Sequence, residues 1–301
     1  MRPKARRTLA LTLAGGALVA GAGLGGCGAP KAQPAVVPRC FATTDAGEAV
    51  LAPDQAGNAA LIAAVAGAKE MSPRAVTIAL ATAMQESKLR NLDYGDLDSL
   101  GLFQQRPSQG WGSAEEVQDP IYAASKFYDE LAKVPGFEDM PITEAAQAVQ
   151  RSAFPDAYAQ HEASARSFAS ALTGHSQAAL ACVFRDVVAG EAVAADQFIT
   201  TFTAEWGQAK AAHVSLVPAP AGEAGAASPS TPPQLRLQGA DATETWALAQ
   251  WAVAKGAELG VQSVRVDAYV WQRGQAQWVQ LDPTSEPGSN QVPAAIVTLA
   301  L

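Results

Sequence analysis

The chain has 301 residues, of which 49% are hydrophobic and 17% are charged. This apolar fraction can build folded cores, which excludes a mainly disordered chain, and the length suits one large domain or two modest ones. With 21 Lys and Arg against 29 Asp and Glu, the formal charge is −8. An acidic chain without a cluster of Lys and Arg in its mature part does not bind phosphates well, so nucleic-acid binding is excluded.

Residues 1–26 have the pattern of an export signal. Basic residues precede an apolar run at residues 8–24, which glycines interrupt and which closes with Leu24-Gly25-Gly26-Cys27. The run is short for a membrane span, and small residues crowd its end as cleavage requires. The closing tetrapeptide resembles the lipobox of bacterial lipoproteins, which implies that Cys27 is lipidated and becomes the new N-terminus. The alternative is an ordinary signal peptide with an incidental Cys27.

Lipidation implies a location in the bacterial cell envelope. Acyl chains on Cys27 would hold the protein on the outer face of the cytoplasmic membrane. No later segment is long and apolar enough to cross a bilayer, so we expect no transmembrane helix in the mature protein. Residues 27–39 are Pro-rich and predict a tether between the lipid and the first domain.

The remaining cysteines, Cys40 and Cys182, lie in an exported and therefore oxidising setting, which predicts a disulfide. The bond would close a loop of about 140 residues, for which chain-entropy models give about 4–5 kcal/mol of stabilisation. The alternative is two buried, unpaired cysteines.

Between residues 54 and 173 the pattern is helical. Ser72-Pro73 and Asp119-Pro120 each combine an N-cap residue with a proline at the first helical position. The expected helices cover residues 54–70, 73–87, 120–134, 143–152 and 155–174. Residues 89–118 form a long loop rich in Gly, Asp and Gln, and a loop of that length inside a compact helical domain is typically functional.

After Cys182 helical and strand patterns alternate. We expect helices at 188–206 and 243–259, strands at 213–217, 235–237, 261–272, 277–281 and 295–299, and a mobile loop at 218–233. The predicted fold class is α+β, with an all-α domain at residues 40–182 followed by a small α+β domain with a mainly antiparallel sheet at 183–301. Four tryptophans of the second domain are expected to pack between its helix and sheet, namely Trp246, Trp251, Trp271 and Trp278.

Glu86 is the candidate catalytic residue. It stands in the last turn of a predicted helix whose apolar positions, such as Ile78 and Leu80, are expected to be buried. Desolvation and the negative end of the helix dipole both disfavour the ionised carboxylate, which predicts a raised pKa. Cleavage of a glycosidic bond requires a protonated carboxyl group, because it must protonate the departing oxygen. The alternative is an ordinary solvated glutamate.

The surrounding residues form a recognisable pattern. Glu86-Ser87 followed by Ser99-Leu100-Gly101-Leu102-Phe103-Gln104 resembles the soluble lytic transglycosylases, a lysozyme-like family whose motifs are Glu-Ser and then Gly-Leu-Met-Gln. Phe103 stands where the family has Met. The resemblance continues through residues 105–112 and Asp119-Pro120, and it covers about residues 54–174. It implies a lysozyme-like fold for residues 40–182, Glu86 as catalytic acid, and substrate contacts from Ser87, Phe103 and Gln104.

The family's third motif, Tyr-Asn-Ala-Gly, is replaced in this chain. Gln150-Arg151-Ser152-Ala153 stands in its place and Tyr158 follows, so Gln150, Arg151 and Tyr158 are the candidates to orient the substrate. Tyr94, Phe103 and Trp111 are the candidates to stack on sugar faces. For each of these side chains the alternative is packing in the core or on a helix surface.

The resemblance implies cleavage of peptidoglycan glycan strands without a cofactor. Glu86 would protonate the oxygen that links N-acetylmuramic acid to N-acetylglucosamine, and then act as base while the muramyl C6 hydroxyl closes an anhydro ring. This scheme uses one protein carboxylate. In a muramidase, Asp93, Asp96 or Asp98 would instead activate water as the second carboxylate of an inverting hydrolase.

Other classes find less support in the sequence. His161, His175 and His213 are scattered and no paired Cys motif exists, which argues against a metal site. A Gly-x-Ser-x-Gly nucleophile elbow is missing too. The replaced third motif favours a second interpretation, a non-catalytic lipoprotein of the same fold that binds peptidoglycan or scaffolds partners. A third class, a solute-binding lipoprotein, is suggested only by the lipid anchor. The sequence lacks the two matched α/β lobes that this class would need.

Overall fold

A computed structural model describes residues 37–45, 47–151, 155–187, 193–218, 232–281 and 292–300. In these residues the fold is mixed α+β with antiparallel sheets, which confirms the predicted class. The signal, Cys27, most of the tether, Ser152, Ala153 and most of the loop predicted at 218–233 lie outside the described residues. No helix in the described ranges has the length and apolarity to cross a membrane.

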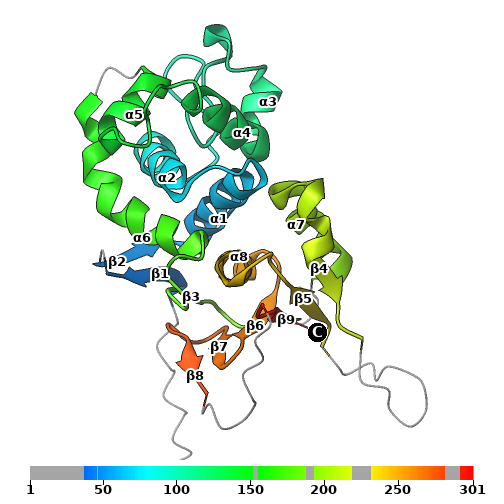
Figure 1. Cartoon of the computed structure of the whole chain (residues 1–301). Helices are drawn as coiled ribbons and strands as arrows, with labels where there is room; N and C mark the ends of the chain where they lie inside the picture. The colour runs from blue at the N-terminus through cyan, green and yellow to red at the C-terminus, as the bar shows by residue number, and fades with distance from the viewer. Residues whose placement is uncertain are drawn as a thin grey trace, which may run out of the picture. The chain divides into compact units, whose positions relative to one another are not determined.

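The helices of the first half surround α2 (Pro73–Ser87), as Figure 1 shows. Ser72 caps α2, because its hydroxyl accepts a hydrogen bond from the Ala75 amide at 3.2 Å and Pro73 follows at the first position. Asp119 caps α4 in the same way through the Ile121 amide at 2.8 Å. The other helices are α1 (Pro53–Ala68), α3 (Ala114–Gln118), α4 (Pro120–Leu131), α5 (Ile142–Gln150) and α6 (Glu162–Leu172), with 3-10 turns η1 (Pro107–Gln109) and η2 (Pro155–His161).

Two of these elements differ from the sequence-based expectation. The helix predicted for residues 155–174 begins as η2, and its α-helical part starts only at Glu162. The long loop contains α3, which a capping box fixes, because the Ser113 hydroxyl accepts from the Glu116 amide and the Glu116 carboxylate accepts from the Ser113 amide.

The expectation that residues 40–182 are all-α is wrong at both ends of that range. An antiparallel sheet of order β2-β1-β3 is built from β1 (Arg39–Thr44), β2 (Gly47–Leu51) and β3 (Leu180–Val183). These strands are too short to show a clear alternating pattern in the sequence. In addition, β1 pairs with β3, and most of the helical residues lie between these two strands in the sequence. Cys40 lies opposite Cys182 in this ladder, and the two form the predicted disulfide, which ties β1 to β3.

The C-terminal half contains a six-stranded antiparallel sheet of order β4-β5-β9-β6-β7-β8. The segment predicted as one strand over 261–272 is a hairpin, because Asp267 adopts a left-handed φ of 49° and turns the chain between β6 and β7. The elements are α7 (Ala195–Trp206), η3 (Gln208–His213), β4 (Val214–Leu216), β5 (Gln234–Leu237), α8 (Ala242–Ala254), η4 (Lys255–Ala257), β6 (Val261–Val266), β7 (Tyr269–Gln272), β8 (Val279–Gln280) and β9 (Ala295–Leu299).

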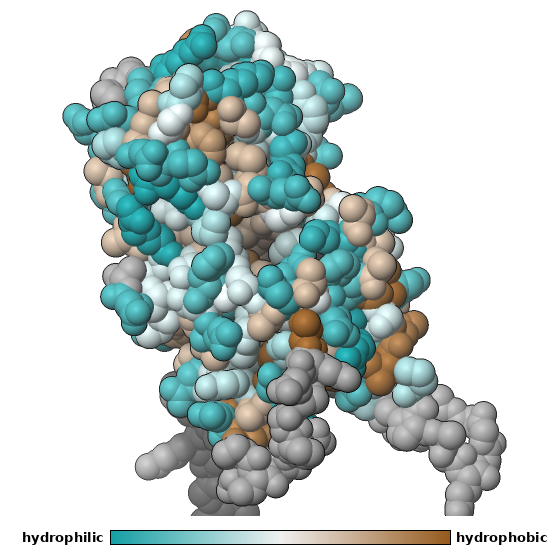
Figure 2. Space-filling view, in the orientation of Figure 1, coloured by the Kyte–Doolittle hydropathy of each residue, from teal (hydrophilic) through white to brown (hydrophobic). Residues whose placement is uncertain are grey.

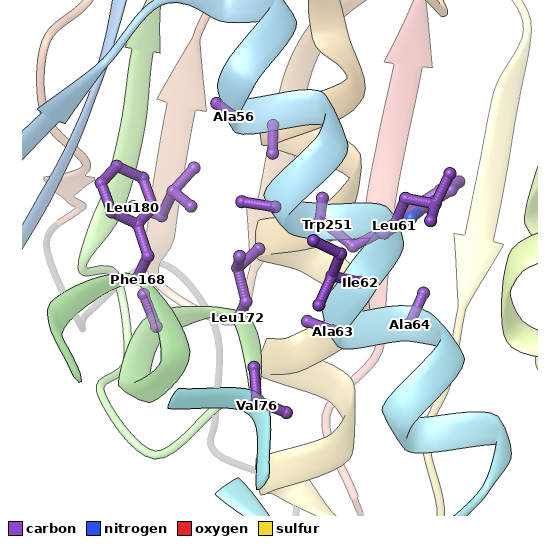
Figure 3. Close-up of a cluster of buried hydrophobic side chains, with 14 of the residues drawn as sticks. Ala56, Leu61, Ile62, Ala63, Ala64, Val76, Phe168, Leu172, Leu180 and Trp251 are labelled. Carbon is purple, nitrogen blue, oxygen red and sulfur yellow. The ribbon is translucent and has the colours of Figure 1, made fainter. Parts of the chain in front are cut away.

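Helix α8 joins the two halves. It packs on α1 and α6 on one side and on β6 and β9 on the other, and its residues from Thr245 to Ala254 are buried. Figure 3 shows the shared core, in which Ala-rich turns of α1 lie beside Leu172 and Trp251. All four tryptophans predicted to pack between helix and sheet are buried. From Val36 onward the chain is one compact unit.

Candidate functional site

Glu86 is half-buried in the last turn of α2, and neutral groups surround its carboxyl group. The hydroxyl of Tyr158, in η2, donates to Oε1 of Glu86 at 2.8 Å. The side-chain amide of Gln150, the last residue of α5, also hydrogen-bonds to Glu86. The structure therefore brings together Glu86, Gln150 and Tyr158, three of the residues singled out in the sequence.

The pKa of Glu86 is raised above its ordinary value of 4.5. Burial is the main cause, since it withdraws solvent from the charged form. The hydrogen bonds from Tyr158 and Gln150 act in the opposite direction, because they stabilise the carboxylate. The carboxyl group is thus biased towards the protonated form while both neighbours hold it in place.

Ser87 and Gln150 attach the long loop to the end of α2. The Ser87 hydroxyl donates to the Leu102 carbonyl at 2.7 Å and contacts the Ala83 carbonyl at 3.0 Å. Nε2 of Gln150 donates to the Phe103 carbonyl at 2.8 Å. Ser87 is 5% exposed and its hydroxyl is bonded to the loop, which argues against the predicted direct contact with a substrate.

The loop itself is held in a defined shape by Gln104. This residue adopts a left-handed φ of 46°, and its Nε2 donates to the carbonyls of Tyr94 at 3.2 Å and Gly101 at 3.3 Å. A Cβ at position 95 would meet the Ser99 carbonyl oxygen at 2.6 Å, so glycine is needed there for the backbone to pass. Tyr94 is 68% exposed and Gln104 is half-buried, so solvent reaches both side chains.

Two predicted sugar-stacking residues lie elsewhere. Phe103 is fully buried and its ring stacks on Phe127 with centroids 4.7 Å apart, so it belongs to the core and does not face a ligand. Trp111 is partly buried and packs against the same core, with its backbone carbonyl accepting from the Tyr122 hydroxyl at 3.2 Å. Arg151 is exposed and ends α5 with a left-handed φ of 53°.

The three aspartates of the loop differ sharply from Glu86. Asp98 accepts hydrogen bonds from the Ser108 amide at 2.7 Å, the Ser108 hydroxyl at 2.9 Å and Nε of Arg106 at 3.0 Å. The Ser108 amide and Arg106 lower the pKa of Asp98 to about 2. This carboxylate caps η1 and is a poor base for activating water. Asp93 and Asp96 are exposed to solvent.

Sequence reasoning missed one cluster beside Glu86. Nε2 of His161 lies 3.1 Å from Oε1 of Gln85, and Gln160 donates to the same oxygen at 3.0 Å. Burial lowers the pKa of His161, so this imidazole is biased towards the neutral form. No sequence motif marks the contact, because η2 and the end of α2 are brought together only by the tertiary fold.

Within the residues described, no group of three His, Cys, Asp or Glu side chains is placed to hold a metal ion. Comparison with known proteins adds no identification: no family model matches the chain, and no curated protein matches it significantly.

Proposed function

We propose that this protein cleaves peptidoglycan glycan strands, with Glu86 as general acid and base. The observation that supports this most is the environment of the Glu86 carboxyl group, which is half-buried, has a raised pKa and is held by the neutral groups of Tyr158 and Gln150. A protonated carboxyl in a fixed orientation is the group that a glycosidic bond needs in order to break.

The proposed reaction uses this one carboxyl group. Glu86 gives its proton to the oxygen between N-acetylmuramic acid and N-acetylglucosamine as the C1–O bond breaks. The resulting carboxylate then takes the proton of the muramyl C6 hydroxyl, whose oxygen bonds to C1 and closes the anhydro ring. An inverting hydrolase needs a second free carboxylate, and the engagement of Asp98 with Arg106 and Ser108 argues against Asp98 in that role.

The proposal also assigns the residues that bind the glycan and the location of the protein. Gln104 and Tyr94 are the side chains assigned to hold the glycan, because a fixed loop presents them beside the end of α2. Residues 40–182 carry the cleavage and residues 183–301 brace them through α8. A lipid on Cys27 would keep the enzyme at the outer face of the cytoplasmic membrane, next to its substrate.

The test compares purified wild-type protein with Glu86→Gln on cell-wall sacculi, and follows released muropeptides by chromatography and mass spectrometry. Loss of a general acid lowers the rate by about 10²–10⁴-fold, so Glu86→Gln should release almost nothing while wild type releases products with anhydro ends. Glu162→Gln is the matched control, because Glu162 is a partly exposed residue paired with Arg166, and it should keep full activity.

Three outcomes would contradict the proposal or its mechanism. Equal release by wild type and Glu86→Gln would remove Glu86 from the chemistry. No release by either protein, together with co-sedimentation of both with sacculi, would instead favour the non-catalytic peptidoglycan-binding lipoprotein. Products with reducing ends would exclude the anhydro ring closure and leave hydrolysis.

A further inference from the structure

A hollow lies at the end of α2 opposite Glu86. It has a volume of about 410 Å³ and is lined by cationic and hydroxyl side chains from α2, α6 and the segment after α6. Its polar lining includes Arg74, Thr77, Arg166, Ser170, His175 and Ser176. Two guanidinium groups, those of Arg74 and Arg166, and one carboxylate, that of Asp45, belong to that lining.

The charge on Arg74 is not balanced by any carboxylate in the part of the chain that the structure describes. Its Nη2 donates to the Met140 carbonyl, and its Nε is buried without a hydrogen-bond partner among those residues. Arg166 is paired with Glu162 through Nε and Nη2, which leaves part of its five-donor guanidinium available. Two guanidinium groups in one hollow are suited to an oxyanion, because each can bind phosphate or carboxylate oxygens in a forked arrangement.

An adjoining hollow is mostly apolar. It has a volume of about 300 Å³, and its walls include Ala63, Ala66, Met71, Val76, Leu172 and Trp206. Figure 2 shows the surface hollowed near its centre, where α1, α6, α7 and α8 meet. Walls of this kind and volume fit a hydrocarbon body.

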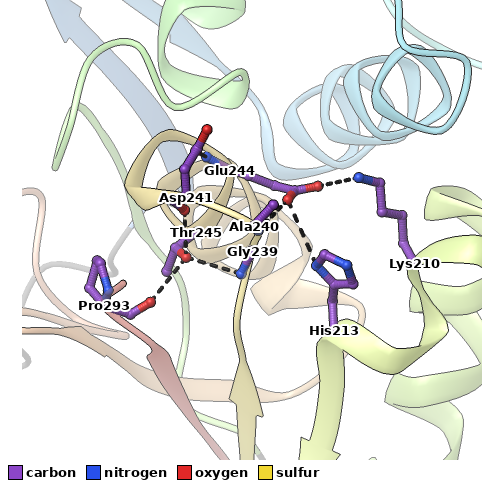
Figure 4. A network of polar contacts seen from close by, with 8 residues as sticks. All are labelled: Lys210, His213, Gly239, Ala240, Asp241, Glu244, Thr245 and Pro293. Carbon is purple, nitrogen blue, oxygen red and sulfur yellow. Dashed lines mark hydrogen bonds and ion pairs between the residues drawn. The ribbon is translucent and has the colours of Figure 1, made fainter. Parts of the chain in front are cut away.

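The charged groups at the rim of the apolar hollow are Lys210, Asp241 and Glu244. Figure 4 shows Glu244 between Lys210, at 2.5 Å, and His213, at 3.8 Å. Asp241 caps α8, because its carboxylate accepts from the Glu244 amide at 2.8 Å. Since Lys210 is paired with Glu244 and Asp241 adds a second carboxylate, an anionic head group is assigned to Arg74 and Arg166 and not to this rim.

Pro73 and His175 line both hollows, so the two share a wall. We propose that together they bind an anionic amphiphile, with its phosphate or carboxylate head on Arg74 and Arg166 and its hydrocarbon body along the apolar walls. The site is separate from Glu86, because Arg74 and Glu86 lie near opposite ends of α2, about 18 Å apart along the helix axis. The proposal therefore does not depend on the proposed cleavage activity.

Calorimetric titration of the full-length protein tests this proposal, with hexyl phosphate and inorganic phosphate as probes at matched ionic strength. Hexyl phosphate should bind one to one and at least about tenfold more tightly than inorganic phosphate, because its chain leaves water for apolar walls. Heptanoate in a third titration distinguishes a carboxylate head from a phosphate head.

Variants separate the two parts of the site. Arg74→Gln and Arg166→Gln should each weaken hexyl phosphate about tenfold or more, whereas Arg90→Gln, whose guanidinium pairs with Asp54, should change nothing. Ala66→Leu fills the apolar hollow and should weaken hexyl phosphate but leave inorganic phosphate unchanged. Glu86→Gln should bind hexyl phosphate as wild type does.

If hexyl phosphate binds no more tightly than inorganic phosphate, the apolar hollow does not bind the hydrocarbon chain, and the proposal of an amphiphilic ligand is overturned. Unchanged binding in both arginine variants, each shown to be folded by circular dichroism, would overturn the site itself. Equal weakening by Arg90→Gln would show that only general charge is involved, and would overturn it too.

Discussion

Glu86 is half-buried and Glu205 is fully buried, and they also differ in the charge of their partners. Burial raises the pKa of each carboxyl group. At the end of α2, Glu86 has only neutral partners, Tyr158 and Gln150, and it is half-exposed. Between α7 and η4, Glu205 is 3% exposed and lies 2.5 Å from Nζ of Lys255, with the Trp251 indole donating to it at 2.7 Å.

The cationic partner of Glu205 distinguishes this carboxylate, which stabilises the fold, from Glu86, the proposed general acid. Burial alone would lower the pKa of Lys255, but Glu205 and Glu258 outweigh it and raise that pKa, so Lys255 is charged. This ion pair ties α7 to the end of α8. The partners named for Glu86, Tyr158 and Gln150, are neutral, and in the proposed reaction its carboxyl group gives up a proton and takes one back.

The largest effect is expected at Lys255. Replacement by Met leaves Glu205 buried without its counter-charge, and breaking a buried ion pair in this way costs about 3–5 kcal/mol. Urea unfolding measures the loss. The double variant Glu205→Leu with Lys255→Met should recover much of the stability, because it removes both charges together. A loss below about 1 kcal/mol in the single variant would show that the pair is solvated, and the contrast with Glu86 would disappear.

The contrast also shows what local sequence can predict. Ser72-Pro73 and Asp119-Pro120 locate helix starts because capping depends on residues only a few positions apart. Glu86 is selected from its place at the end of an apolar helix together with the resemblance of Glu86-Ser87 and residues 99–104 to the lytic transglycosylases, and its catalytic role stays a prediction. Lys255 and Glu205 carry no such signal, since fifty residues separate them and only the packing of α7 on α8 brings them together.

Side-chain direction within the long loop is a second limit. Phe103 and Gln104 are adjacent, yet one packs on Phe127 in the core and the other faces the surface beside Tyr94. Gln104 adopts a left-handed φ, and the local sequence does not predict this backbone conformation for a glutamine. The short strands β1 and β3 are a similar case, because their pairing depends on residues about 140 positions apart.

A medium effect is expected at Tyr158, which we infer to position Glu86. Tyr158→Phe should lower kcat for glycan cleavage about tenfold, with little change in KM, because the carboxyl group loses its fixed orientation. The Tyr158 hydroxyl lowers the pKa of Glu86, so its removal should move the alkaline limb of the pH–rate profile to higher pH.

Tyr128→Phe is the matched control for this variant. Tyr128 is equally buried, but its hydroxyl donates to the Ile62 carbonyl at 3.1 Å, away from Glu86. It should leave the pH profile unmoved even if stability falls. A profile that shifts equally in both variants would mean that Tyr158 acts only through packing.

The smallest expected effect is the change in the free energy of unfolding when Glu86 is replaced by Gln. The pKa of Glu86 is raised in the folded chain, so the folded state binds the proton of this carboxyl group more tightly than the unfolded state does. The resulting contribution to the free energy of unfolding is present below pH 4.5 and is lost as pH rises through the folded pKa. Glu86→Gln, which cannot ionise, should therefore be more stable than wild type at pH 7, on the order of 1 kcal/mol, with the difference vanishing near pH 4. Glu205→Gln should be less stable at pH 7, because Lys255 loses a buried partner. Urea unfolding at both pH values measures the two signs. If Glu86→Gln were as destabilising as Glu205→Gln, the carboxylate at position 86 would be a structural group like its counterpart, and its assignment as an acid would fail with it.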